Sequence, residues 1–249
     1  MSAFYRTFLA GLVAFGLYLP QAGAAALSPE QRGEVETIIK EYLLANPELI
    51  FEVLEKLEAR RKEQEASESQ QRLVENKAEI FQSKYDFVEN PEGHIPLVEF
   101  FDYQCGYCKR VLPALQQVRR DHPDVRLIFK EFPILGPASV FAARAAIASK
   151  RQDRYMAFHD ALMGHRGSLD ETVVLSVAKD IGLDIEQLRQ DMERPEVEEE
   201  IDFNRALAAR MNIRGTPSMY FGEKFIPGAI AYRQMQQMLD ELRANCAVC

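Results

Sequence analysis

The motif Cys105-Gly106-Tyr107-Cys108 directly follows a short apolar segment, and this order constrains the fold more than any other feature. The segment Ile95 to Phe101 is rich in branched and aromatic residues and is typical of a buried strand. The residues from Cys108 to Arg120 predict a helix. A thiol at such a junction lies at the positive end of the helix dipole, which stabilises its thiolate. We therefore expect a redox pair in which Cys105 is the nucleophile and Cys108 the resolving thiol.

The elements after this junction predict an α/β domain. They comprise a second strand at Val125 to Glu131, several helices between Ala138 and Met211, strands at Met219 to Phe221 and Lys224 to Ile226, and a closing helix at Ile230 to Arg243. The order β-α-β, helical block, β-β-α is that of a mixed α/β fold with one large helical insertion.

Two helices precede this domain. An apolar stripe recurs at helical spacing between Ser28 and Leu57, and Asn46-Pro47 divides it in two. Such narrow stripes bury too little surface to fold alone, so we expect residues 27–60 to self-associate as a dimer or trimer. The alternative is that the stripes fold back onto the rest of the chain. Residues 61–90 are largely polar and predict a helical linker that ends at Asn90-Pro91-Glu92-Gly93.

The N-terminus predicts export. Residues 1–26 combine Arg6, an uncharged apolar run from Phe8 to Leu19, and the small residues Ala22-Gly23-Ala24, as in a secretory signal peptide. An uncleaved anchor is the alternative, but this run is shorter than the ~20 apolar residues that span a bilayer. We expect a periplasmic protein.

Charge excludes one class of partner. The chain has 38 acidic and 30 basic residues, with a net charge of −8, and its lysines and arginines form no block that could track phosphates. We therefore expect no nucleic-acid partner.

Further motifs carry a family resemblance. Glu99-Phe100-Phe101 precedes the cysteine pair, Pro113 follows it within the helix, and Thr216-Pro217 precedes a later strand. With the cysteine motif, this set resembles the DsbA-like branch of the thioredoxin superfamily. The resemblance implies a thioredoxin fold over residues 91–249, with a helical insertion at about 137–211.

The resemblance also implies roles for individual residues. Pro217 is expected to be cis and to pack against the cysteine pair, and Thr216, with Gly106 and Tyr107, to contact substrate. Glu99 corresponds to a buried acid that could relay the proton of Cys108. The alternative for Glu99 is an ordinary edge-facing glutamate. We expect Lys130 to pair with Glu99.

The segment from Glu36 to Glu48 resembles the oligomerisation segment of ScsC-type and Com1-like proteins of the DsbA family. This implies an oligomeric periplasmic enzyme without a cofactor. It would isomerise or reduce misoxidised exported proteins and exchange electrons with a membrane redox partner. The alternatives are a DsbA-type dithiol oxidase, whose clients are reduced exported proteins, and, in a different class, a copper-binding module for copper tolerance.

A second cysteine pair stands at the C-terminus. Cys246 and Cys249 follow the closing helix, so no helix N-terminus activates them, and a structural or labile disulfide is the expected outcome. Capture of a soft metal such as Cu(I) is the alternative. The histidines show no ligand spacing and are interpreted as surface or hydrogen-bonded residues: His94, His122, His159 and His165.

Overall fold

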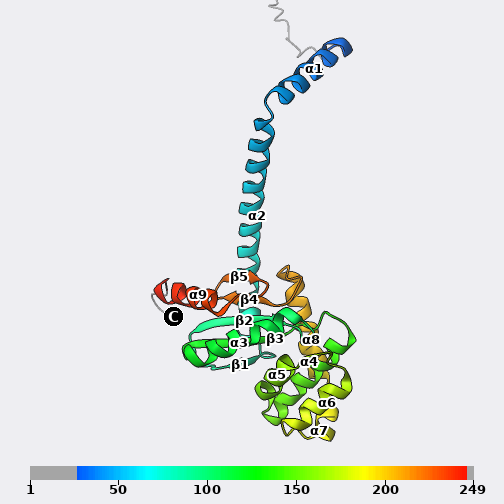
Figure 1. Ribbon diagram of the computed structural model, residues 1–249, viewed down its shortest axis with the longest axis vertical. Helices are drawn as coiled ribbons and strands as arrows, with labels where there is room; N and C mark the ends of the chain where they lie inside the picture. Colours follow the sequence, from blue (N-terminus) through cyan, green and yellow to red (C-terminus); the bar gives the residue numbers. More distant parts are fainter. Residues whose placement is uncertain (1–26, 246–249) are drawn as a thin grey trace, which may run out of the picture. The chain divides into compact units, whose positions relative to one another are not determined.

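The computed structural model describes residues 27–245, which form two units, residues 27–62 and 63–245 (Figure 1). The predicted signal peptide, Cys246 and Cys249 lie outside the described residues. Within residues 27–245, no helix has both the length and the hydropathy needed to cross a membrane.

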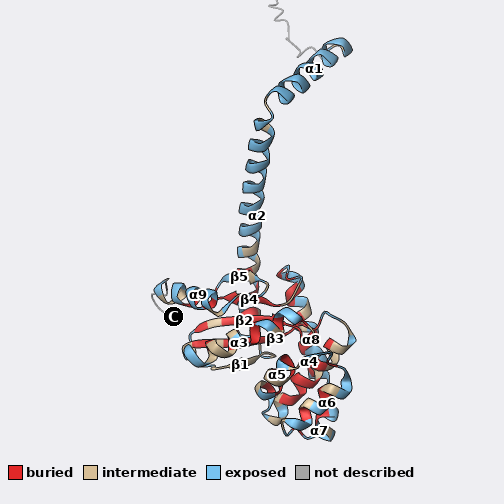
Figure 2. Cartoon of the chain, viewed as in Figure 1, coloured by how far each residue is buried: buried red, intermediate tan, exposed pale blue. Residues whose placement is uncertain are grey.

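The first unit contains α1 (Pro29–Ala45) and the beginning of α2 (Glu48–Phe81). Ser28 caps α1: its hydroxyl accepts the Gln31 N–H at 3.2 Å, and the Gln31 side chain accepts the Ser28 N–H at 2.9 Å. No residue of α1 is buried, and its apolar side chains are exposed (Figure 2). Within residues 27–62, the predicted stripe on α1 therefore has no partner that buries it.

The predicted helical linker is wrong at its C-terminal end. α2 ends at Phe81, and Phe87–Glu89 forms strand β1 instead of continuing the helix to residue 90. Leu73 and Ile80 of α2 are buried in the second unit, at 2 % and 0 % exposure. These apolar residues are widely spaced among polar ones, so the polar composition of the segment did not indicate that the C-terminal end of α2 is buried.

The second unit is built on a five-stranded sheet in the order β1-β3-β2-β4-β5. The other strands are β2 (Ile95–Phe101), β3 (Val125–Glu131), β4 (Ser218–Phe221) and β5 (Lys224–Pro227). β2 pairs parallel to β3 and antiparallel to β4. Because β2 lies in the centre, its residues are buried on both faces, as its continuous apolar run predicted.

Helices cover both faces of this sheet. On one face, Leu97 and Phe101 pack with α3 (Gly106–Asp121) and α9 (Tyr232–Asn245). On the other face, Val98 and Phe100 pack with the end of α2 and with α8 (Pro195–Arg210). The sheet thus holds two separate apolar cores.

The predicted insertion lies between β3 and β4 (Figure 1). Before α8 it contains α4 (Pro137–Ser149), the 3-10 turn η1 (Lys150–Gln152), α5 (Tyr155–Gly164), α6 (Glu171–Asp180) and α7 (Ile185–Met192). Asp170 and Asp184 cap α6 and α7 by accepting backbone N–H groups at 2.9 and 3.0 Å. These helices begin where the sequence offers side-chain acceptors.

The predicted pairing of Lys130 with Glu99 is wrong. In the parallel register Glu99 lies opposite Phe129, whereas Lys130 lies opposite Phe100, so the two charged side chains point to opposite faces of the sheet. Lys130 instead binds Asp86 at 2.6 Å and donates to the Glu79 carbonyl at 2.9 Å. A register shift of one residue decides which partner it meets.

This buried ion pair generates a stability prediction. The side chains of Lys130 and Asp86 are 0 % and 1 % exposed, so Lys130→Met leaves an uncompensated buried carboxylate. We expect a loss of about 3–5 kcal/mol in the free energy of unfolding, measured by urea denaturation, and recovery of most of it in Lys130→Met/Asp86→Asn.

The control is Lys84→Met, which removes an exposed lysine whose ammonium lies 4.8 Å from the Tyr85 ring centroid and should change stability by no more than about 1 kcal/mol. A double variant no more stable than Lys130→Met would contradict this account of the pair.

Candidate active site

The cysteine pair stands where β2 leads into α3, as the sequence predicted. Cys105 occupies the N-cap position of α3 in an extended conformation, and its N–H donates to the Asp102 carbonyl at 3.0 Å. Cys108 lies in the first turn of the helix. Both are free thiols and both are largely buried, with exposures of 7 % for Cys105 and 2 % for Cys108. The site is therefore a dithiol with its more accessible sulfur at the helix start.

The surroundings of the two thiols shift their pKa values in opposite directions. Hydrogen bonds from the Cys108 thiol, and then from the Thr216 side chain and the backbone amides of Cys108 and Tyr107, lower the pKa of Cys105 to about 5 despite its burial. Burial raises the pKa of Cys108 well above its usual range, and its hydrogen bond to Cys105 and the neighbouring Glu99 add to this shift. At neutral pH Cys105 is a thiolate and Cys108 remains protonated.

Glu99 is a buried acid, which excludes the edge-facing alternative. It is 2 % exposed in the middle of β2. Burial, and secondarily the charge of Cys105, raise its pKa to about 8. Since Glu99 in turn raises the pKa of Cys108, the three groups form one electrostatic unit.

The Thr216–Pro217 peptide bond is cis, in agreement with the prediction. The antiparallel pairing of β4 with β2 brings it to the dithiol, because Ser218 lies opposite Phe100 at the end of β2. The Thr216 carbonyl lies 3.2 Å from the Cys105 sulfur and accepts its hydrogen bond in the thiol form. Residues 111 positions apart in sequence thus share the site.

A groove of about 530 Å³ opens beside Cys105. Tyr107 and Thr216 line it, as do Arg110, Val111 and Gly228–Ile230. The Arg110 guanidinium lies over the Tyr107 ring, 3.9 Å from its centroid. Sequence reasoning missed Gly228–Ile230, since nothing in that apolar loop signals that it lies beside the cysteines.

Asp102 organises the loops around the dithiol and was also missed. Its carboxylate accepts the N–H groups of Gln104 at 2.7 Å, Ile134 at 2.8 Å and Leu135 at 3.0 Å, and the Ser139 hydroxyl at 2.7 Å. An acidic residue directly after a buried strand was the available signal. Asp102 fixes the turn before Cys105 against the loop after β3.

A second buried polar group lies behind this turn. Glu131 accepts hydrogen bonds from Tyr103 at 2.9 Å and Tyr155 at 2.8 Å, and His159 Nδ1 lies 3.2 Å from the Tyr103 hydroxyl. Burial raises the pKa of Glu131 well above its usual range and lowers that of His159 to about 3. Burial therefore favours the protonated form of Glu131, and His159 is a neutral, hydrogen-bonded core histidine, as predicted.

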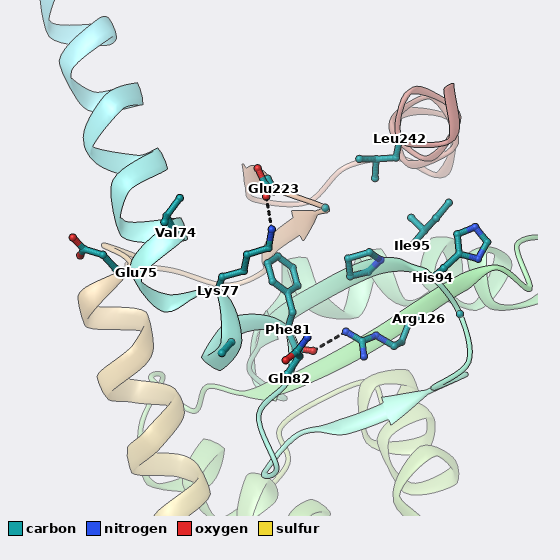
Figure 3. Close-up of a pocket in the computed structure, with 14 residues that line it drawn as sticks. Val74, Glu75, Lys77, Phe81, Gln82, His94, Ile95, Arg126, Glu223 and Leu242 are labelled. Carbon is teal, nitrogen blue, oxygen red and sulfur yellow. Dashed lines mark hydrogen bonds and ion pairs between the residues drawn. The ribbon is translucent and has the colours of Figure 1, made fainter. Parts of the chain in front are cut away.

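A separate cavity of about 890 Å³ lies at the opposite end of β2 (Figure 3). Ile95, Phe81 and Leu242 form apolar walls, and Lys77 and Glu223 form an ion pair at 2.8 Å. None of its lining residues belongs to the dithiol site. Among residues 27–245 there is also no group of three or more histidine, cysteine or acidic side chains that could hold a metal ion.

Comparison with known proteins supports these features. Residues 96–240 match the family described as DSBA-like thioredoxin domain, and residues 31–64 match the copper resistance protein ScsC N-terminal domain. These matches confirm the resemblance that the motifs indicated, and with it the thioredoxin fold, its helical insertion and the preceding helices.

Several solved structures are similar. A thioredoxin-like oxidoreductase from Silicibacter pomeroyi is 45 % identical, with a TM-score of 0.66, over 68 % of this chain and 98 % of that one. ScsC from Proteus mirabilis in a transitional conformation is 26 % identical, with a TM-score of 0.65, over 89 % of this chain and 99 % of that one. A periplasmic thioredoxin-like protein from Salmonella enterica is 28 % identical, with a TM-score of 0.59, over 68 % and 95 %.

The first curated relatives are much longer proteins. The chain is 28 % identical over 138 residues to a Na⁺/H⁺ antiporter from Salinispora tropica, and the match covers 54 % of this chain. It spans only 21 % of the length of that antiporter. The similarity is thus to one part of these relatives.

The pKa shifts of Cys105 and Glu99 predict opposite effects on stability. The pKa of Cys105 is about 5 in the folded dithiol form and about 9 in the unfolded chain. Its contribution to the free energy of unfolding therefore grows as pH rises from 5 to 9. The pKa of Glu99 is about 8 in the folded protein and about 4.5 in the unfolded chain. Its contribution to the free energy of unfolding is therefore lost as pH rises through 8. Between pH 5 and 8 the two contributions oppose one another.

We therefore expect Cys105→Ser to lose stability with rising pH more steeply than the wild type, and Glu99→Gln to gain stability with rising pH relative to it. The measurement is urea unfolding under reducing conditions at several values between pH 5 and 8. Parallel pH profiles for the three proteins would contradict the assigned shifts.

Proposed function

The chain belongs to the family of DSBA-like thioredoxin domains, and on this premise we propose that it is a periplasmic thiol–disulfide oxidoreductase that isomerises or reduces wrong disulfides in exported proteins. The observation that supports the proposal is the asymmetry of the dithiol. A pKa of about 5 leaves Cys105 about 99 % ionised at pH 7, ready to attack. Cys108 stays protonated until a mixed disulfide needs resolution.

The exchange proceeds in two steps. The Cys105 thiolate attacks one sulfur of a client disulfide, a Cys105–client disulfide forms, and the other client sulfur leaves as a thiolate. In isomerisation a second client thiolate then attacks the mixed disulfide, restores Cys105 and leaves the number of disulfides unchanged. In reduction Cys108 loses its proton and attacks Cys105, so the client gains two electrons and the pair becomes a disulfide. A membrane redox partner would then return it to the dithiol.

In this scheme Glu99 accepts the proton of Cys108. The negative charge of Cys105 contributes to the raised pKa of Glu99, and this contribution disappears once Cys105 enters a neutral mixed disulfide. The pKa of Glu99 then falls, so the carboxylate form becomes more available when Cys108 must ionise. Thr216, Pro217, Gly106 and Tyr107 would hold the client chain beside Cys105.

The N-terminal helices support assembly into a homo-oligomer through residues 27–60. Apolar side chains stay exposed in both helices, for example Ile38 at 63 %, Leu44 at 72 % and Phe51 at 69 %. Burying such a stripe against other copies is favourable at about 25 cal/mol per Å². An assembly of this kind would present several dithiols to one tethered client at high effective concentration, which favours isomerisation.

The alternative is a dithiol oxidase. A stabilised Cys105 thiolate favours the dithiol form of the protein, so the disulfide form would readily accept electrons from a reduced client. The same site chemistry serves both directions, and the N-terminal assembly is the feature that favours isomerisation. Export rests on the predicted signal peptide and agrees with the similarity to a periplasmic protein of Salmonella enterica.

The proton-relay role predicts a selective kinetic defect. Glu99→Gln should slow resolution of the Cys105 mixed disulfide by Cys108 on the order of 10²-fold at pH 7, because the amide cannot accept a proton. The first attack by Cys105 should slow much less. Stopped-flow reaction with a fluorescent disulfide separates the two steps. Glu92→Gln, at an exposed acid, is the control, and equal resolution rates in both variants would exclude a relay through Glu99.

The isomerase proposal is tested with scrambled ribonuclease. The double variant Ile39→Gln/Leu54→Gln interrupts the exposed stripe on both helices, and Lys40→Gln/Glu55→Gln changes neighbouring exposed polar positions as the control. We expect the first variant to become monomeric by light scattering and to lose at least about tenfold in ribonuclease reactivation, while its thiols remain reactive. Full reactivation by a monomer would contradict the proposed role of assembly.

A further inference from the structure

Five segments lie around the dithiol, namely the first turns of α3 and four loops with the adjoining helix ends, and together they are called the rim below. They are residues 106–111, 132–137, 164–169, 212–217 and 227–232. Asp102 holds segment 132–137, the Thr216 carbonyl contacts the Cys105 sulfur, and the Gly228 N–H donates to the Pro217 carbonyl at 2.9 Å. Lys109 donates to the carbonyls of His165 at 2.9 Å and Gly167 at 3.5 Å, and the Gln104 side chain donates to the Leu169 carbonyl at 2.8 Å. The insertion thus contributes a loop to the edge of the site.

The rim has a charge opposite to that of the chain. The whole sequence has eight more acidic than basic residues, yet the rim contains Lys109, Arg110, His165, Arg166 and Arg214 and no aspartate or glutamate. The charged side chains of the rim are therefore all basic, and the exposed acid that directly follows segment 164–169, Asp170, caps α6 by accepting the Val173 N–H at 2.9 Å. Electrostatic fields of this kind attract ligands of opposite charge and raise association rates.

Among residues 27–245, no carboxylate partner is found for the three rim arginines. Arg110 lies over the Tyr107 ring, Arg214 donates to the Asn212 side chain at 2.9 Å, and all three arginines, including Arg166, are exposed. None of the three forms an ion pair within the part of the chain that the structure describes. Arg119, by contrast, binds both Glu89 and Asp160. The positive charge of the rim is thus available to a ligand.

Apolar side chains are exposed between these cations. Tyr107 is 59 % exposed, Leu135 54 % and Ile134 39 %. Asp102 holds the backbone N–H groups of Ile134 and Leu135 inward, so this turn is kept beside the dithiol. The rim therefore offers both apolar contact and positive charge within reach of Cys105.

We propose that the rim selects client segments in which the disulfide cysteine is flanked by acidic and apolar residues. The inference rests on the proposed function and specifies its substrate class. An acidic segment would otherwise be repelled by the net negative charge of the chain and by the Cys105 thiolate. The rim offsets this repulsion, so that the thiolate attacks the client disulfide and expels the second sulfur as a thiolate.

The test uses peptides that differ only in charge. Three peptides carry one cysteine, disulfide-linked to the same uncharged fluorescent thiol, and have aspartate, glutamine or lysine at the flanking positions. The second-order rate constant for reporter release by the reduced wild-type protein should be at least about tenfold higher with aspartate than with lysine at low ionic strength. The ratio should fall to within about twofold in ~1 M salt, where the Debye length is about 3 Å.

Variants show whether the rim arginines cause the preference for the aspartate peptide. Arg110→Gln/Arg166→Gln/Arg214→Gln should reduce the aspartate-to-lysine ratio to about 1 or below, and Arg110→Gln alone should reduce it in part. Arg154→Gln/Lys179→Gln/Arg189→Gln removes the same charge from exposed positions outside the rim and should keep the wild-type ratio. Both rate constants in the ratio are measured with the same variant, so a general change in the reactivity of that variant does not affect the ratio.

Equal rates for the three peptides with the wild type would overturn the inference and leave the proposed function intact. A control variant that lowers the ratio as much as the rim variant would also overturn it, because net charge alone would then explain the preference. Failure to reduce any peptide would instead contradict the proposed function.

Discussion

The stabilisation of the Cys105 thiolate is the interaction on which the rest of the site depends. Its pKa of about 5 requires the helix start that follows β2, the Cys108 thiol one turn along, and the Thr216 side chain. Thr216 reaches the sulfur only because β4 pairs antiparallel to β2 across the middle of the sheet. Asp102 then fixes the turn between strand and helix. The sheet therefore acts as a frame that brings distant residues to one sulfur.

Much of this arrangement could be predicted because it depends on local order. The strand before the cysteines and the helix after them follow from residues within a few positions of one another, whereas the burial of Glu99 was expected from the family resemblance. The position of Thr216 was predicted only through the family resemblance, since strand pairing over such a separation leaves no local pattern.

The errors have a common physical origin. Lys130 was assigned to Glu99 because both are charged residues in neighbouring strands, but the alternation of side chains sends them to opposite faces. β1 was missed because three residues at the end of a polar segment give too short a pattern. Glu131 and Gly228–Ile230 acquire their roles from tertiary contacts alone. The rim is a property of the folded chain, since its five segments are scattered between residues 106 and 232.

The most direct test of the account is the reduction potential of the Cys105–Cys108 pair, measured against glutathione at pH 6 and pH 7. A stabilised thiolate favours the dithiol, so we predict a potential between about −120 and −180 mV at pH 7, in the range of disulfide donors and isomerases. Because the dithiol already lacks one proton, the potential should change by about 30 mV per pH unit. A value near −270 mV, with a change of about 59 mV per pH unit, would mean that Cys105 is an ordinary protonated thiol and would contradict the account.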